Sequence, residues 1–346
     1  MKRIGNLITE EKITTEFCKS AIVEASKSKH KRREVKYIFR HLEEKAEELK
    51  DMILNETFTP SPYTYKTKYE YGKERKLLIP AFYPDQCVHH ILMMLIRDKV
   101  ISRIDPYAVA SIPKRGQSMA VKHIKRWKPT KHMIKADIKK CFDNVRPEVI
   151  MNMYKRIIKD KKYLRLKAKV VYSTDSLPLG NYCSAFDLNL LLKRVDEYIR
   201  SHNFVKHYIR YMDDMLIFVS NWRKAKKLRE GINEELAKLG LTLKENYQLY
   251  HYKDRGIDFV GYRFFNKLTI LRKRNLKRLY RKHLKLDSVI TMREAQSIMS
   301  MLGFATHCYS SRVRKLFNTK QLRDIIRRGD RNWHTHLCSL PQIGVA

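Results

Sequence analysis

Two adjacent aspartates, Asp213 and Asp214, lie between two short segments of strand-forming residues. Apolar and aromatic residues at 208–211 and again at 215–219 predict a β-hairpin that turns at 212–214. Two carboxylates at the tip of a buried hairpin raise each other's pKa, and a divalent cation between them removes that cost. The alternative interpretation is a surface turn, because Asp is common in turns whatever the protein does. The rest of the chain decides between the two.

The charge of the chain indicates the kind of partner. Its 346 residues, 43% of them hydrophobic, are enough for a large core and for two or three domains. Lys and Arg number 73 against 36 Asp and Glu, which gives a net charge of +37. Such a field predicts a polyanionic partner, and nucleic acid is the leading candidate. An anionic membrane fits less well, because the basic residues are spread over the whole chain.

The cysteines and the hydropathy pattern predict a cytoplasmic protein. The six cysteines include no C-x-x-C pair and suggest no disulfide framework, as expected in a reducing compartment. The N-terminus has no apolar run of the signal-peptide type. The apolar stretch 91–96 is far shorter than the ~20 residues that a membrane helix needs. We therefore expect a soluble protein with no membrane partner.

A third carboxylate, Asp137, falls near the end of an alternating segment at 133–138 that predicts a strand. If this strand neighbours the hairpin, Asp137 joins Asp213 and Asp214. Hard oxygen ligands with open positions suit Mg²⁺, which keeps waters and substrate phosphates as its other ligands. Two such ions clamp the attacking and leaving oxygens of a phosphoryl displacement. In a chain of charge +37, this combination predicts nucleotidyl transfer with nucleic acid and a nucleoside triphosphate as substrates.

Two basic segments could contact phosphates. Residues 63–80 predict a hairpin that turns near Gly72, where Lys73 and Arg75 could hold a triphosphate, although a solvated tip is the commoner case. Arg115 precedes a predicted helix at 118–127 and could contact template phosphates.

The other elements expected from the pattern include a loop with Pro178 and Gly180 that leads into an apolar helix, with Asn181 and Ser184 placed to cap it. A helix at 85–100 carries His89 and His90, which we interpret as structural. The remaining expectations are a helix at 222–239, a strand at 241–247, a strand pair at 256–265, and helices at 272–285, 292–302 and 311–326. Two histidines and Cys338 in the tail could bind a metal ion, but no fourth ligand is in register with them, which favours a plain tail.

The ordered series of these segments resembles the reverse transcriptases. Residues 136–142 resemble motif A, with Asp137 as a metal ligand and Phe142 as the aromatic gate against a 2′-hydroxyl. Residues 177–184 resemble motif B, and 211–214 resemble motif C. The resemblance implies two Mg²⁺ ions held by Asp137, Asp213 and Asp214.

The resemblance also implies substrate contacts. Those with the incoming dNTP fall on Lys73, Arg75, Phe142, Leu179, Gly180, Asn181 and Lys244, of which Lys244 matches the motif D lysine near the leaving pyrophosphate. Those with an RNA template and a DNA or RNA primer fall on Arg115, Tyr211, Met212, Gly261 and Tyr262, of which the last two belong to a segment that resembles the primer grip.

The fold implied is an α+β right-hand polymerase with fingers, a palm whose antiparallel sheet carries the acidic site, and a helical thumb. Fingers are expected at 1–120, the palm with interleaved fingers helices at 121–265, and a basic helical thumb and tail at 266–346.

Within the reverse transcriptases, residues 111–116, 177–181 and 256–262 resemble bacterial enzymes related to those of group II introns. The closest resemblance is to diversity-generating retroelement enzymes, because Leu179 precedes the motif B glycine and residues 301–308 match their C-terminal region. Ala185 departs from that group, which usually has Gln there. The group implies error-prone copying opposite adenine and a small basic accessory protein. The alternatives are a phage-defence reverse transcriptase and a non-catalytic RNA-binding scaffold.

Overall fold

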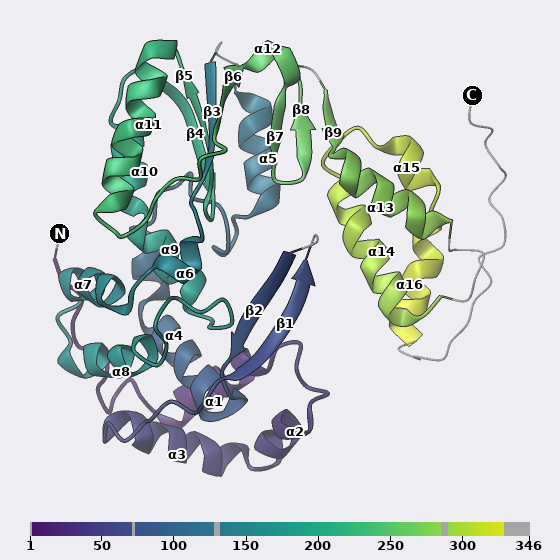
Figure 1. The fold of residues 1–346 in the computed structure, drawn as a ribbon. Helices are drawn as coiled ribbons and strands as arrows, with labels where there is room; N and C mark the ends of the chain where they lie inside the picture. Colours follow the sequence, from purple (N-terminus) through teal and green to yellow (C-terminus); the bar gives the residue numbers. More distant parts are fainter. Residues whose placement is uncertain (1, 71–72, 128–131, 267, 285–289, 329–346) are drawn as a thin grey trace.

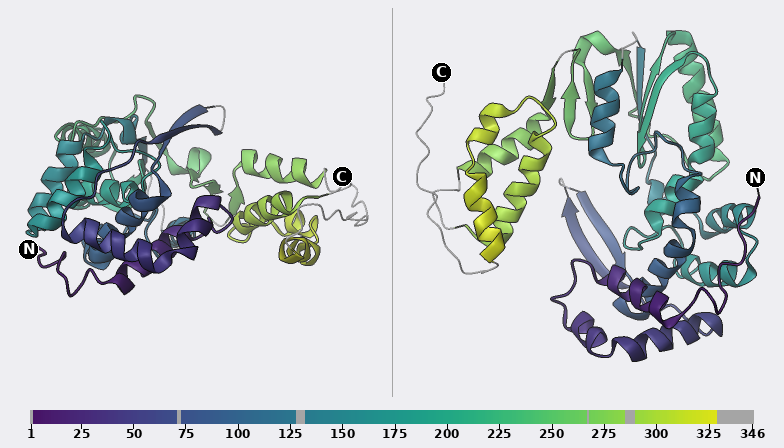
Figure 2. Two further views of the ribbon diagram at one scale, coloured as in Figure 1. Left: turned by 90° about the horizontal axis from the view of Figure 1, so that it is seen from below. Right: turned by 180° about the vertical axis from the view of Figure 1, so that it is seen from behind.

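A computed structural model describes residues 2–70, 73–127, 132–266, 268–284 and 290–328 (Figure 1). The chain forms an α+β structure with three parts: N-terminal helices with a long hairpin, a central sheet covered by helices, and a helical bundle set to one side (Figure 2). Among the described residues, no helix combines the length and the apolar character required to span a bilayer.

The N-terminal part packs four helices around one core. Helices α1 (Thr15–Ser26), α2 (Arg33–Arg40) and α3 (Leu42–Leu54) surround α4 (Cys87–Ile101), which a π-helical segment η1 (Phe82–Gln86) precedes. The predicted basic hairpin is confirmed: β1 (Thr64–Glu70) pairs with β2 (Lys73–Ile79) in an antiparallel register. His89 and His90 are buried, and burial lowers the pKa of these imidazoles to about 3 and about 4, so both are structural.

The central sheet has the strand order β4-β5-β3-β6 and is antiparallel throughout. Its strands are β3 (His132–Asp137), β4 (Val205–Tyr211), β5 (Asp214–Val219) and β6 (Gln248–His251). Helices α10 (Lys193–Arg200) and α11 (Trp222–Ala237) cover one face, and α5 (Gln117–Arg126) covers the other (Figure 1). Because both faces are covered, β5 is apolar at every position after Asp214 instead of alternating.

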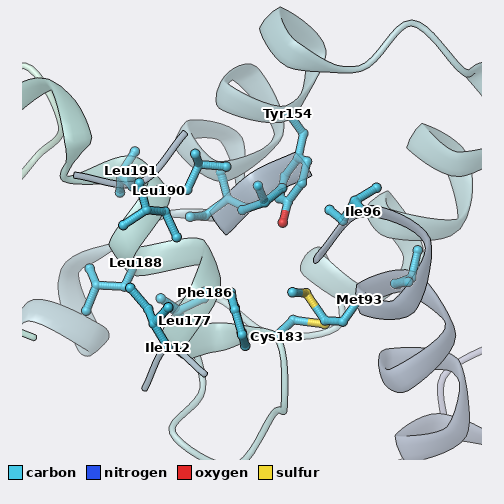
Figure 3. Packing of buried hydrophobic residues seen from close by; sticks show 14 of the residues in the cluster. Met93, Ile96, Ile112, Tyr154, Leu177, Cys183, Phe186, Leu188, Leu190 and Leu191 are labelled. Carbon is cyan, nitrogen blue, oxygen red and sulfur yellow. The ribbon is translucent and has the colours of Figure 1, made fainter. Parts of the chain in front are cut away.

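A cluster of helices lies between the sheet and the N-terminal part. It contains α6 (Cys141–Asn144), α7 (Pro147–Ile157), α8 (Lys161–Val171) and α9 (Ser184–Leu191). Apolar side chains of α9 and α4 pack there around Tyr154 and Cys183, which belong to the main core (Figure 3).

The C-terminal bundle follows a small sheet. A short helix α12 (Tyr252–Arg255) leads into β7 (Ile257–Phe259), β8 (Tyr262–Phe264) and β9 (Thr269–Leu271), which confirms the predicted strand pair. The bundle contains α13 (Lys273–His283), α14 (Met292–Ala305), α15 (Ser311–Lys315) and α16 (Thr319–Arg328). Thr291 and Glu294 form a capping box that begins α14.

Two of the expected elements are wrong in their bounds. The strand expected at 241–247 lies later, as β6, because the amide of Leu243 bonds to the Asn233 side chain and the amide of Lys244 bonds to the Asp137 carbonyl. The helix expected at 311–326 is divided into α15 and α16, since the Asn318 side chain accepts a hydrogen bond from the Gln321 amide and starts a new helix. The tail residues of the predicted plain tail lie outside the described residues.

A fully buried ion pair connects the sheet to its helices. Arg210 on β4 and Asp196 on α10 are both 0% exposed, and two guanidinium nitrogens lie 2.7 Å from the two Asp196 carboxylate oxygens. Tyr208 donates to the same carboxylate at 2.5 Å, and Arg210 also bonds to the Asn189 side chain at 3.0 Å. A further guanidinium bond, 2.9 Å long, reaches the carbonyl of Met212 in the hairpin turn.

We predict that Arg210→Met lowers the free energy of unfolding by about 3–5 kcal/mol, because it leaves the Asp196 carboxylate buried without its cation. The control is Lys27→Met, which removes a pair between residues 65% and 38% exposed and should cost less than about 1 kcal/mol. Urea denaturation of both variants measures the difference. Equal losses in the two variants would contradict the prediction.

Candidate active site

The structure brings the three predicted aspartates to one end of the central sheet. Asp137 is the last residue of β3 and is the register partner of Asp214, the first residue of β5. Asp213 lies in the two-residue turn between β4 and β5, and its carbonyl accepts the Ile138 amide at 3.2 Å. Met212, the other residue of this turn, has a φ of 56° and is held by its bond to Arg210. The predicted hairpin is therefore confirmed.

The environment of this turn opposes ionised carboxylates. Burial, with the negative charge of Asp137, raises the pKa of Asp213 to about 6. Burial also raises the pKa of Asp214 to about 7, although Lys135 and Arg272 act in the opposite direction. The site thus concentrates negative charge where water is scarce, which is a state that a bound cation stabilises.

Lys244 provides a cation within the protein itself. Its ammonium lies 2.6 Å from a carboxylate oxygen of Asp137, and it lowers the pKa of Asp213. The Lys244 amide donates to the Asp137 carbonyl at 2.8 Å, which fixes the lysine at this edge of the sheet. The motif D position is therefore next to the acidic cluster.

The donor set suits Mg²⁺. One carboxylate oxygen each of Asp137 and Asp214 is buried without a hydrogen-bond partner. In the ranges that the structure describes, no three His, Cys, Asp or Glu side chains form a ready-made metal cluster. Mg²⁺ commonly binds one or two carboxylates and takes its other ligands from water and substrate phosphates, so a sparse set of carboxylates fits this ion.

The motif A residues continue from β3 into the short helix α6. Cys141 is buried, and burial with the nearby Asp213 charge raises the pKa of its thiol to about 12. Phe142 is partly buried against the main core, one residue further along α6. Its contact with a nucleotide ribose stays a prediction.

The motif B loop packs directly on the basic hairpin. A Cβ added to Gly180 would lie 1.7 Å from the carbonyl oxygen of Leu78 on β2, so only glycine fits there. Asn181 is buried and donates to the Tyr63 hydroxyl at 2.9 Å, while its side-chain oxygen is buried without a partner. Leu179 is 37% exposed at the outer surface of the loop.

The capping roles expected for Asn181 and Ser184 are wrong. Helix α9 begins at Ser184 with no side-chain cap, and the Ser184 hydroxyl bonds instead to the Pro178 carbonyl at 2.6 Å. Both side chains therefore shape the loop and not the helix end.

A second buried ion pair lies behind this loop. Lys167 and Asp187 are 1% and 3% exposed and lie 2.8 Å apart, and Tyr154 donates to the same carboxylate at 2.6 Å. Neither Asp187 nor Arg210 was expected from the sequence. The sequence contained one sign of both buried pairs, namely a charged residue inside an otherwise apolar segment. Burying such a charge is costly unless a partner of opposite charge is buried with it.

The β7–β8 turn connects the sheet region to the bundle. Val260 and Gly261 have φ angles of 41° and 88°, and the Gly261 carbonyl accepts bonds from the Arg272 amide at 3.0 Å and the Asn275 side chain at 3.2 Å. Gly261 and Tyr211 line a cavity of about 470 Å³ together with residues of α13 and α14. The primer contact predicted for them stays a prediction.

The predicted primer contact of Tyr262 is not supported. Its side chain is fully buried, and its hydroxyl donates to the Phe304 carbonyl at 2.8 Å. Tyr262 therefore fixes the bundle against β8 from within.

Arg115 also has a structural bond, since one guanidinium nitrogen donates to the carbonyls of Asp105 and Ala108 at 2.7 and 3.0 Å. Its template contact stays a prediction.

A basic cleft of about 890 Å³ separates the hairpin from the bundle. Lys68 and Tyr69 of β1 line one side, and five cations of α13 line the other: Lys273, Arg274, Lys277, Arg278 and Arg281. Arg75 is the register partner of Lys68 and is exposed near the same tip. Gly72 and the side chain of Lys73 lie outside the described part.

A helix-flanked antiparallel sheet with paired carboxylates at one end, a hairpin on one side and a basic helical bundle on the other defines a right-hand polymerase: fingers, palm and thumb. The family described as reverse transcriptase (RNA-dependent DNA polymerase) matches residues 82–264. This match covers more than half of the chain, which therefore belongs to the reverse transcriptase family.

Individual relatives are distant. Protein YkfC of Escherichia coli is 22% identical over 63% of this chain and 71% of its own length. The apo telomerase of Candida tropicalis has a similar fold, with a TM-score of 0.50, 13% identity, and coverage of 78% of this chain and 62% of that one. A telomerase of Candida albicans, solved with a fragment of telomeric RNA, gives a TM-score of 0.47 at 12% identity, and the match covers 78% of this chain and 57% of that chain. The chain thus spans about three-fifths of the length of these telomerases.

The raised pKa values of Asp213 and Asp214 predict that, in buffer free of divalent cations, the stability of the protein depends on pH. Folding raises the pKa of Asp213 and Asp214 from 3.8 to about 6 and about 7, so the folded state binds more protons than the unfolded state between these limits. The free energy of unfolding should therefore fall as pH rises from about 4 to about 7, and less steeply in Asp214→Asn. Urea denaturation across this pH range measures the slope, and added Mg²⁺ should restore stability at the upper end. The exposed Asp143 gives the control, Asp143→Asn, whose slope should match that of the wild type; a wild-type slope in Asp214→Asn would refute the assignment.

The close packing at Gly180 predicts that replacing a glycine by alanine changes stability in opposite directions at positions 180 and 303. Gly180→Ala should lower the free energy of unfolding by about 1–3 kcal/mol, because the new methyl group overlaps the Leu78 carbonyl. Gly303 in α14 meets nothing within 4 Å, so Gly303→Ala should instead stabilise the helix by about 0.5–1 kcal/mol. Denaturation of the two variants in parallel checks the opposite signs.

Proposed function

We propose that this chain copies an RNA template into DNA by adding deoxynucleotides to the 3′-end of a primer. The supporting observation is the acidic cluster itself: Asp137, Asp213 and Asp214 meet at one end of the palm sheet, and two of them present buried carboxylate oxygens that no protein group satisfies. A structural scaffold has no use for such a costly arrangement.

In this proposal Asp137 and Asp213 hold two Mg²⁺ ions and Asp214 supports them. The ions, when bound, supply Lewis acidity at the primer 3′-hydroxyl and at the leaving pyrophosphate. The protein holds the carboxylates in place through the β3–β5 register and through the Arg210 bond to the hairpin turn. Lys244, next to Asp137, would pair with substrate phosphates in this proposal.

The basic cleft between the fingers hairpin and α13 supports nucleic acid and a dNTP as the substrates. Lys73 and Arg75 would neutralise the triphosphate of a dNTP, and the α13 cations would follow the phosphate backbone of the RNA template and its DNA or RNA primer. Phe142 would exclude the 2′-hydroxyl of ribonucleotides. Binding should weaken steeply with salt, because phosphate contacts release counterions.

The biological role is a further part of the proposal. The resemblance of motif B and of residues 301–308 to diversity-generating retroelement enzymes supports error-prone copying in the cytoplasm with a small basic accessory protein. A phage-defence role uses the same chemistry. Sequencing the cDNA distinguishes them, since substitutions concentrated opposite template adenines are expected only for the retroelement type.

The decisive experiment is primer extension on an RNA template with dNTPs and Mg²⁺. Asp137→Asn and Asp213→Asn should each lower the rate at least about a hundredfold, because each removes a charge that stabilises the transition state through the metal. Asp143→Asn is the matched control: it changes an acid six residues after Asp137, in α6, and should keep full activity.

RNA binding by each variant should be measured in the same preparation. Variants that bind RNA as the wild type does but do not extend the primer establish the catalytic role. A wild type that binds RNA yet makes no DNA, even with RNA and proteins purified from its native host, would favour the scaffold alternative.

A further inference from the structure

A second cavity lies at the other end of the palm sheet. It has a volume of about 460 Å³ and lies where α5, the small sheet β7–β9 and the connection between α14 and α15 meet (Figure 1). Phe218, which lines it, is four residues from Asp214 on β5, and this corresponds to roughly 13 Å along the strand. We call it the distal aromatic cavity, and the polymerase mechanism does not use it.

Six of the thirteen residues that line it carry aromatic side chains. They are Trp127, Phe218, Tyr252, Phe264, Phe265 and Tyr309. Three of the rings are in contact, with Trp127 edge-on to Phe218 at 5.6 Å and Phe218 tilted against Tyr252 at 6.1 Å. The floor is buried, but the rim is not: Phe265 is 37% and Tyr309 is 73% exposed. The exposed rim therefore makes the cavity accessible from solvent to a flat ligand.

The charges around the distal aromatic cavity are positive. Lys125 is the one charged residue among the described residues that line it. The guanidinium of Arg263 lies 6.0 Å from the centre of the Phe265 ring, and Arg314 acts electrostatically on Cys308 in the lining. Lys125 donates one bond to the His307 carbonyl at 2.6 Å, and an ammonium has three donors. The ligand should therefore have a flat group that is apolar on its faces and an attached negative charge within reach of these cations.

We propose that the distal aromatic cavity binds an unpaired nucleobase of the RNA, in the part of the RNA that lies outside the template–primer hybrid. Unpaired bases commonly stack on aromatic side chains while nearby cations hold the adjoining phosphates. The volume is within the range of pockets that enclose one small planar ligand. This inference rests on the proposed function, because it assumes that RNA is the template.

The affinity test compares two RNAs on the full chain: a template that ends with the hybrid, and the same template with a single-stranded extension. Phe265→Ala and Tyr309→Ala should each weaken binding of the extended RNA roughly five- to hundredfold, the cost of losing one stacked base. Neither variant should change binding of the RNA without the extension. Tyr172→Ala, which removes an aromatic side chain 53% exposed at the end of α8, is the control and should change neither.

The salt dependence separates stacking from charge. The aromatic variants should keep the wild-type slope of log affinity against log salt, while Arg314→Gln should reduce that slope by about 1 for the extended RNA only.

Cys308 gives a direct positional readout, because it lines the cavity and the other described cysteines are buried. The extended RNA should slow alkylation of Cys308, read by mass spectrometry of its peptide.

Unchanged affinity of both aromatic variants for the extended RNA, or unprotected Cys308, would overturn the nucleobase assignment and would leave the rim to a protein partner. A wild type that binds neither RNA would instead refute the proposed function. The two failures are therefore distinguishable in one experiment.

Discussion

The buried guanidinium of Arg210 fixes the geometry of the turn that carries Asp213, on which the candidate active site depends. It pairs with Asp196 on α10, bonds to Asn189 on α9 and donates to the carbonyl of Met212, which directly precedes Asp213. Removing two full charges from water is costly, and the cost is offset only when every donor and acceptor is satisfied. The turn that carries Asp213 is thereby coupled to the packing of two helices. A hairpin tip would otherwise be among the more mobile parts of a sheet.

The second buried pair, Lys167 with Asp187, holds α9, the helix that follows the motif B loop. Asp187 and Asn189 are two residues apart on α9, so one short helix contributes to both polar networks. The rest of the helix is apolar apart from Ser184, and all of its residues except Ala185 are buried. Figure 3 shows Phe186, Leu188, Leu190 and Leu191 of this helix in the core. Its position relative to the sheet is therefore specified by directional bonds as well as by apolar packing, and the loop that contains Gly180 and the turn that contains Asp213 are held by a common element.

The sequence predicted those features that depend on local pattern. Strong apolar periodicity located β3, β4, β5 and the hairpin of β1 and β2, and the order of the acidic segments predicted that Asp137 meets Asp214. It failed where long-range bonds decide the outcome. The segment that contains Leu243 has strand-like residues, but Asn233 takes its amide. Tyr262 has the sequence position of a primer-contacting residue, yet burial against Phe304 removes it from the surface. Arg210 gave only a weak signal, because its partner Asp196 lies on another element.

The two ion pairs of the palm, Arg210 with Asp196 and Lys244 with Asp137, differ in their burial. Asp196 is saturated by a bidentate guanidinium and a tyrosine hydroxyl, all of them buried, so neither partner can leave without a large rearrangement of the fold. Asp137 is paired with one ammonium, that of Lys244, and the two side chains are 38% and 34% exposed. A lysine on a flexible stem in contact with solvent can exchange for another cation at little cost, whereas a buried arginine cannot. In the proposed function, a permanent ion pair positions the turn that carries Asp213, and an exchangeable one holds Asp137 until Mg²⁺ and substrate bind.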